Sequence, residues 1–189
     1  MLVPPHAAGM RIATIIFLLV ISVGQAQTNC KSGILYSSAD VSTGNYPEMK
    51  IKKMRHALWS DSIIITKRKK EKITLSPEKI WGYRDKDCGL YRSYQDEFYK
   101  VEQADSLVIY TGVLSPFENY SFTFYYFSRD LNSPIFKLTR KNLEDVFRKN
   151  TCFLSRIDKE IKWYEDYTAV DKKKHIYKIA EIYRECLKK

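Results

Sequence analysis

The stretch Glu97–Asp130, EFYKVEQADSLVIYTGVLSPFENYSFTFYYFSRD, decides the fold class. It contains three runs rich in β-branched and aromatic residues, Glu97–Gln103, Ser106–Leu114 and Tyr120–Asp130. Turn-forming Asp, Ser, Pro and Asn residues separate these runs. Short runs of this composition, joined by turns and not by helices, predict consecutive antiparallel strands.

The same pattern extends the sheet in both directions. Before this stretch we expect strands in Gly33–Ser38, Lys79–Asp85 and Leu90–Tyr94, a loop at Val41–Pro47 and a hairpin within Asp61–Ser76. After it, Pro134–Thr139 has the composition of one more strand. Seven or eight strands with no alternating helices predict an antiparallel β meander, forming a curled sheet or a partly open barrel. A doubly wound parallel sheet is disfavoured, because it requires helices between its strands.

The spacing of apolar residues changes to a helical period from Thr139 onward. Thr139 can cap a helix over Arg140–Phe147. Three apolar stripes at helical spacing follow: Leu143, Val146 and Phe147; Phe153, Ile157, Ile161 and Tyr164; and Ile176, Ile179, Ala180, Tyr183 and Leu187. These faces require burial, so we predict an α+β domain that is strand-rich over 33–138 and helical over 139–187. Its C-terminal helices pack on one face or end of the sheet.

Residues 1–26 have the parts of a secretory signal peptide. Arg11 precedes an apolar run, Ile12–Val23, and small residues stand near a cleavage-type end. The run is shorter than the roughly 20 apolar residues of a membrane span, which disfavours an uncleaved anchor. A lipid anchor fits poorly, because polar Gln27–Asn29 precede Cys30. We expect a periplasmic or secreted protein, with a single domain over 27–189 and no transmembrane segment in the mature chain. Met10 is an alternative start of translation.

Export changes how the cysteines are interpreted. Cys30, Cys88, Cys152 and Cys186 all fall in the mature part, and an oxidising compartment favours disulfides. Their wide separation lacks the close pairs of structural zinc sites. Four cysteines allow three pairings. Cys152–Cys186 is the pairing we expect first, because it would join the start of one helix to the end of another. Four buried, inert thiols remain the alternative.

The chain is basic, with a formal net charge of +10, and only Arg11 of the leader is charged, so residues 27–189 carry +9. A basic balance attracts lipid headgroups, acidic polysaccharide and nucleic acid. Export removes the usual nucleic-acid targets. The densest basic run, Thr66–Ile73, lies in the expected hairpin, where lysine also protects a strand edge from aggregation.

The segment IWGYRDKDCGLYRSY, Ile80–Tyr94, concentrates aromatic rings and arginines around the turn DKDCG. We predict a hairpin in which Gly89 supplies the left-handed backbone of the turn. Asp85 and Asp87 resemble the start of a calcium loop, but Asp96 stands where a bidentate glutamate is required, which disfavours calcium. The contact candidates are Trp81, Tyr83, Arg84, Tyr91, Arg92 and Tyr94. Packing as half-buried sheet residues is the competing interpretation for each of them.

A search for catalytic motifs finds no candidate centre. The mature chain keeps two histidines, His56 and His175. His175 is beside no obvious nucleophile, and a pair of His56 with Cys30 or Cys88 could be assembled only by the fold and is not supported by the spacing. It has no His-Glu-x-x-His zinc motif, no Gly-x-Ser-x-Gly elbow and no phosphate-binding glycine loop. We therefore predict no catalytic residue, no metal site and no cofactor.

Several segments together resemble a family of uncharacterised exported proteins common in Bacteroidetes. They include GILYSSADVSTGNYP, KIWGYRDKDCGLYRSYQDEFYKV and YTAVDKKKHIYKIAEIY, and the resemblance spans about Gly33–Tyr183. Its best marker is the Trp-Gly-Tyr-Arg hairpin; family members tend to place Asp-Gly in the turn, whereas here Cys88 separates Asp87 from Gly89. The resemblance implies an envelope location and a strand-rich domain with a helical end. It transfers no catalytic residue.

Two functions of different classes remain open. The first is an exported accessory module that binds an envelope protein or an anionic glycan through its aromatic-rich sheet, since rings stack on sugars and arginine holds carboxylates. The alternative is an envelope hydrolase or thiol enzyme. It requires a pocket with His56 or His175 within hydrogen-bond reach of a Cys, Ser or carboxylate.

Overall fold

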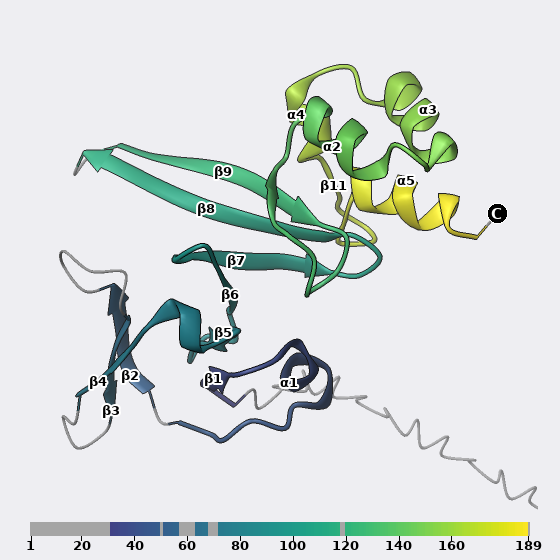
Figure 1. Cartoon of the computed structure of the whole chain (residues 1–189). Helices are drawn as coiled ribbons and strands as arrows, with labels where there is room; N and C mark the ends of the chain where they lie inside the picture. The colour runs from purple at the N-terminus through teal and green to yellow at the C-terminus, as the bar shows by residue number, and fades with distance from the viewer. Residues whose placement is uncertain (1–30, 50, 57–62, 68–71, 118–119, 189) are drawn as a thin grey trace, which may run out of the picture.

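The computed structural model describes residues 31–49, 51–56, 63–67, 72–117 and 120–188. In this part of the chain the main sheet has seven antiparallel strands in the order β1-β5-β6-β7-β8-β9-β10 (Figure 1). Their bounds are β1 Gly33–Leu35, β5 Gly82–Arg84, β6 Leu90–Tyr94, β7 Glu97–Ala104, β8 Val108–Phe117, β9 Tyr120–Ser128 and β10 Phe136–Lys137. The predicted α+β fold with an antiparallel meander is confirmed. The sheet is open, with β1 and β10 at its edges.

Strands β8 and β9 form the long hairpin of the meander. The register pairs Ile109 with Phe127 and Tyr110 with Tyr126. Because side chains alternate across a strand, the first pair faces one side of the sheet and the second pair the other. Ile109 and Phe127 pack with the C-terminal helices, whereas Tyr110 and Tyr126 pack with Ile135 from the loop after β9. Both faces at this end of the hairpin are therefore covered.

A separate three-stranded antiparallel sheet is formed by β2 Ile51–His56, β3 Ile63–Lys67 and β4 Lys72–Leu75. The hairpin predicted within Asp61–Ser76 is confirmed, because β3 and β4 pair antiparallel. Strand β2 was not predicted. Apolar residues of β4 pack against buried residues of the main sheet and the segment before it: Ile73 and Leu75 against Ile34, Ile80 and Tyr83.

The loop predicted at Val41–Pro47 is wrong at its start, because helix α1 covers Ser38–Thr43. The carboxylate of Asp40 accepts hydrogen bonds from the backbone N–H groups of Tyr36 and Ser37, which caps the helix start and lowers the pKa of Asp40. Gly44 ends the helix with a left-handed backbone, at φ 64°.

The helical end of the protein comprises α2 Arg140–Phe147, α3 Thr151–Glu160, α4 Tyr164–Tyr167 and α5 Lys178–Cys186. A short hairpin, β11 Val170–Asp171 with β12 Ile176–Tyr177, connects α4 to α5. These elements gather at one end of the sheet, on the side opposite the strands β2–β4 in Figure 1. In the described part of the chain, no helix is long and apolar enough to cross a membrane.

The helices bury most of the predicted apolar stripes in one cluster with the sheet. Phe153 and Ile157 of α3 are fully buried, and Ile161 follows them into the same cluster. The expected burial is wrong for Tyr164 and Leu187, which are 47% and 57% exposed. Tyr164 lies beyond the end of α3, where the chain turns into α4, and Leu187 follows the last residue of α5.

The predicted disulfide between Cys152 and Cys186 is confirmed. The two Cα atoms lie 5.8 Å apart, within the usual range for a disulfide. Cys152 is in the first turn of α3 and Cys186 is the last residue of α5, so the bond fastens two helices of the same apolar cluster. Cys88 is also disulfide-bonded, whereas Cys30 and the predicted signal peptide 1–26 lie outside the described residues.

The predicted cap of α2 is present, because the Thr139 hydroxyl accepts a hydrogen bond from the backbone N–H of Asn142 at 3.3 Å. We expect Thr139→Ala to lower the free energy of unfolding by about 1 kcal/mol, since it leaves one helix N–H without its partner. Thr139→Ser keeps the hydroxyl and should change the value by less than half as much. Urea denaturation measures both. Equal losses in the two variants would contradict a capping role.

Candidate functional site

The structure places the six predicted contact residues in different environments. Tyr83 is 9% exposed and stacks on Tyr91, with 4.6 Å between ring centroids. Both rings pack in the cluster with Ile34 and Ile80, and burial raises the pKa of Tyr83. Arg84 is partly buried at the end of β5. Tyr83 and Tyr91 therefore serve the packing of the sheet, and none of the three side chains lines the pocket described below.

Arg92 is the most deeply buried charged side chain of this group. It is 4% exposed, and its strand β6 is the third strand from the sheet edge formed by β1. Its Nη1 donates a hydrogen bond to the Tyr110 hydroxyl at 2.8 Å and a longer one to Ser128 Oγ at 3.5 Å. The guanidinium lies over the rings of Tyr94 and Tyr110, 5.6 and 5.9 Å from their centroids. These contacts fix the orientation of the guanidinium.

The charge of Arg92 is not neutralised by a direct ion pair. No carboxylate of the described residues forms a salt bridge with it. Its Nε is buried and has no hydrogen-bond partner. Hydrogen bonds from Ser133 and Asn132 lower the pKa of Asp130, and Arg92 adds to this effect from a longer distance. A buried cation without a close anion is energetically unfavourable, so Arg92 is not explained by stability alone.

A pocket of about 290 Å³ opens beside Arg92. It is lined by Tyr36, Glu78, Lys79, Ile80, Trp81, Arg92, Ser93 and Asn132. Lys79 adds a second cation, and Glu78 is the one carboxylate of the lining. The Trp81 ring is held in place because its Nε1 donates to the Leu131 carbonyl at 3.1 Å. We call this site, defined by these eight residues, the Arg92 pocket.

The Arg92 pocket joins segments that are far apart in the sequence. Tyr36 follows β1, and Glu78 and Lys79 belong to a short 3-10 helix at Pro77–Lys79. Asn132 comes from the loop between β9 and β10. Of the six predicted contact residues, Trp81 and Arg92 line the pocket, and Tyr94 lies under the Arg92 guanidinium. Tyr36 was not predicted as a contact residue. Its ring is 58% exposed, but the exposure of a side chain cannot be read from the sequence.

The turn between β5 and β6 has a structural role. The left-handed backbone predicted at Gly89 occurs instead at Cys88, with φ 70°. Gly89 has a different role: an added Cβ would lie 2.9 Å from the Asp85 carboxylate and would displace it. That carboxylate accepts hydrogen bonds from the N–H groups of Asp87 and Gly89 at 2.9 and 2.7 Å. Asp85 therefore closes the turn. In the described part of the chain, no group of three or more His, Cys, Asp or Glu residues is arranged to hold a metal ion.

Neither histidine is placed in a described pocket. His175 is exposed in the turn between β11 and β12, with φ 52°, and its N–H donates to the Asp171 carbonyl at 2.7 Å. The backbone of His56 lies in β2, but its side chain is outside what the structure describes. The linings of three pockets formed by described residues, near Arg129, Arg92 and Ser38, contain no histidine.

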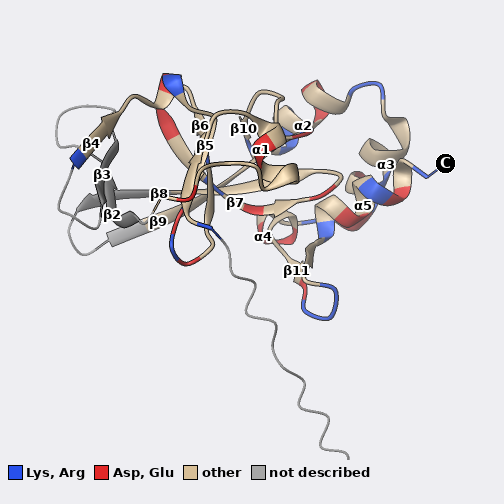
Figure 2. Cartoon of the chain, turned by 90° about the horizontal axis from the view of Figure 1, so that it is seen from below, with Lys and Arg blue, Asp and Glu red and all other residues tan. Residues whose placement is uncertain are grey.

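Comparison with protein-family models, with curated proteins and with solved structures found no match to this chain. The resemblance to exported Bacteroidetes proteins therefore stays a prediction. Among the described residues, Lys and Arg occur both on the strands and on the helical end, interspersed with Asp and Glu (Figure 2). The Arg92 pocket is thus the strongest local indication of function in the described part of the protein.

Proposed function

We propose that this protein is an exported, non-enzymatic binding module that holds an anionic glycan in the Arg92 pocket. The observation that supports this most directly is a buried guanidinium without an ion-pair partner among the described residues, next to a pocket that also contains Lys79 and Trp81. A sugar carboxylate would supply the missing charge and accept hydrogen bonds from the fixed guanidinium. The Trp81 and Tyr36 rings offer apolar faces on which a sugar ring stacks.

The size and chemistry of the pocket favour a sugar acid over a protein partner. Its volume of about 290 Å³ is at the lower end for small-molecule sites, and its lining is mostly polar. The net charge of +9 for residues 27–189 would concentrate a polyanion near the surface. Such attraction weakens with salt, because the screening length is about 10 Å at 0.1 M ionic strength. The disulfide Cys152–Cys186 supports the export part of the proposal, because such bonds persist in oxidising compartments.

Titration with an oligogalacturonate, followed by calorimetry at low ionic strength, tests this function. We expect Arg92→Met to weaken binding by about tenfold or more, the effect of losing charge-assisted hydrogen bonds. Lys159→Met, which removes one exposed charge of α3 outside the pocket, should change the dissociation constant less than about twofold. Equal affinity for a neutral galactose oligomer of the same length would overturn the proposal.

Two further measurements separate a loss of binding from a loss of folding. Arg92→Met retains the Tyr110–Ser128 hydrogen bond and fills similar volume, so we expect the free energy of unfolding to change by about 1 kcal/mol or less. Lys79→Ala alters an exposed pocket residue and should weaken oligogalacturonate binding without affecting folding. Shortening of the oligomer during incubation would instead support the hydrolase alternative.

A further inference from the structure

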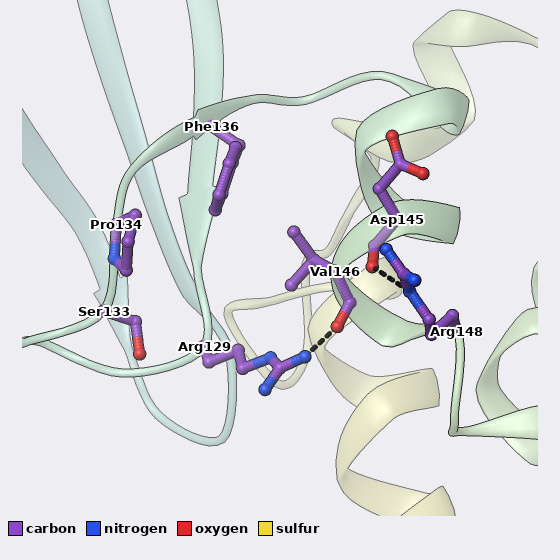
Figure 3. A pocket seen from close by; sticks show the side chains of 7 residues that line it. All are labelled: Arg129, Ser133, Pro134, Phe136, Asp145, Val146 and Arg148. Carbon is purple, nitrogen blue, oxygen red and sulfur yellow. Dashed lines mark hydrogen bonds between the residues drawn. The ribbon is translucent and has the colours of Figure 1, made fainter.

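A second pocket is lined in part by the same loop after β9 that contributes Asn132 to the Arg92 pocket. It has a volume of about 380 Å³, within the range of small-molecule sites. Its lining comes from the loop and strand after β9 and from the end of α2: Arg129, Ser133, Pro134, Phe136, Asp145, Val146 and Arg148 (Figure 3). The Val146 side chain points toward Phe136 across this space in Figure 3.

Three apolar side chains form much of the wall of this pocket. Pro134, Phe136 and Val146 face it, and the Phe136 ring remains 36% exposed although it contacts the buried Phe127 ring at 6.0 Å between centroids. A ligand in this pocket would not have to pair with the edge strand β10 as an added strand. The outward carbonyl of Lys137 in the edge strand β10 already accepts a hydrogen bond from Asn142 Nδ2 at 2.8 Å. An apolar body inserted between Phe136 and Val146 is thus a better fit than an added strand.

Two arginines at the edge of the pocket keep unused hydrogen-bond donors. Arg129 Nη2 donates to the Val146 carbonyl, and its guanidinium lies 5.5 Å from the centroid of the Phe147 ring. Arg148 Nε donates to the Asp145 carbonyl at 3.3 Å. A guanidinium has five N–H donors, so most remain available in both residues. Neither arginine forms a salt bridge with a carboxylate in the described ranges.

Two sources of negative charge could repel an anion at this place: the free carbonyls at the end of α2 and the Asp145 carboxylate. The C-terminal end of a helix carries partial negative charge on its free carbonyls, which repels anions. Here the Val146 and Asp145 carbonyls are covered by Arg129 and Arg148. The Asp145 carboxylate belongs to the lining but points away from Phe136 and Pro134 in Figure 3. The local charge facing the apolar walls is therefore positive.

We propose that this pocket is a second binding site, for a small carboxylic acid with an apolar body. The apolar body lies between Phe136 and Val146, and the carboxylate accepts hydrogen bonds from the free N–H groups of Arg129. The site is independent of the proposed glycan contact, because no residue is common to the linings of the two pockets. The volume of about 380 Å³ favours a free small acid as the occupant.

A matched pair of probes tests this site in the full-length mature protein. We expect 4-phenylbutanoate to bind more tightly than the uncharged 4-phenylbutan-1-ol, and to shift the backbone NMR signals of residues 129–136 and 145–148. Arg129→Met should weaken the acid by about tenfold or more and leave the alcohol within about twofold, which a misfolded pocket would not do. Phe136→Ala should weaken both probes, and Arg92→Met neither.

Several results would overturn the inference. Equal binding of acid and alcohol would show that the arginines do not select charge. Loss of acid binding in Arg92→Met but not in Arg129→Met would place the acid in the Arg92 pocket. Binding of a peptide ending in a free C-terminal phenylalanine, without binding of 4-phenylbutanoate, would replace the small acid by a chain end.

Discussion

The Cys152→Ala/Cys186→Ala double variant is expected to lose about 4 kcal/mol of unfolding free energy. The bond joins residues 34 positions apart, and the loop-entropy model gives about this value for a loop of that length. For a domain of this size the loss corresponds to a melting temperature lower by about 8–16 °C. The loss of unfolding free energy should be close to the value from the loop-entropy model, because the disulfide joins α3 to α5. Phe153 and Ile179 of these helices are fully buried in one cluster.

Urea denaturation monitored by circular dichroism measures this loss under non-reducing conditions. Reduction of the wild-type protein is a useful comparison, because it also breaks the disulfide that contains Cys88. We therefore expect the reduced wild type to be less stable than the double variant. A loss below about 1 kcal/mol in the double variant would contradict the prediction, and would mean that the helices hold the same arrangement without the bond.

The helical half could be predicted because its packing follows a simple period. Residues such as Phe153 and Ile157 recur at helical spacing, and they are buried as expected. The same periodicity placed Cys152 at the start of one helix and Cys186 at the end of another, which led to the correct pairing. It failed at Tyr164 because the Asp166 carboxylate accepts hydrogen bonds from the N–H groups of Lys162 and Trp163, which start a new helix there.

Elements without an apolar period were missed. Helix α1 has no buried residue, so hydrophobic spacing carried no signal, and only the Asp40 and Gly44 caps distinguish it from a loop. Strands β11 and β12 have two residues each and enclose a lysine-rich turn. Such short elements depend on local hydrogen bonds, for example from the backbone N–H of Lys173 to the Asp171 carboxylate at 2.8 Å.

The candidate site was predictable only in part. Composition pointed to Trp81 and Arg92, because rings and arginines cluster around this hairpin. The burial of Arg92 was not predictable, since it depends on the loop after β9, which brings Leu131 and Asn132 over one face of the sheet. The contact between Arg92 and Tyr110 could not be predicted from the sequence either. It depends on the register of β6, β7 and β8, which includes an irregularity between Val101 and Gln103.

Gly82→Ala is expected to lower the free energy of unfolding by about 3 kcal/mol, at the upper end of the cost of overpacking. Gly82 lies directly opposite Arg92 in the register of β5 and β6. An added Cβ would lie 2.0 Å from the carbonyl oxygen of Tyr91 and 3.1 Å from the Arg92 Cα. These are backbone atoms of a paired strand, so the contact can be relieved only by moving β5 or β6. The variant should also weaken oligogalacturonate binding, because the shift displaces Trp81 from Arg92.

Gly112→Ala is the matched control, since Gly112 is also a strand glycine without a left-handed backbone. An added Cβ there meets the Tyr126 ring, with its nearest atom at 3.1 Å. A side chain can rotate where a backbone carbonyl cannot, so we expect a loss of less than about 1 kcal/mol. Urea denaturation of the two variants side by side gives the comparison. A loss at Gly82 as small as the one expected at Gly112 would mean that β5 is free to move, and that Gly82 does not fix the distance between Trp81 and Arg92.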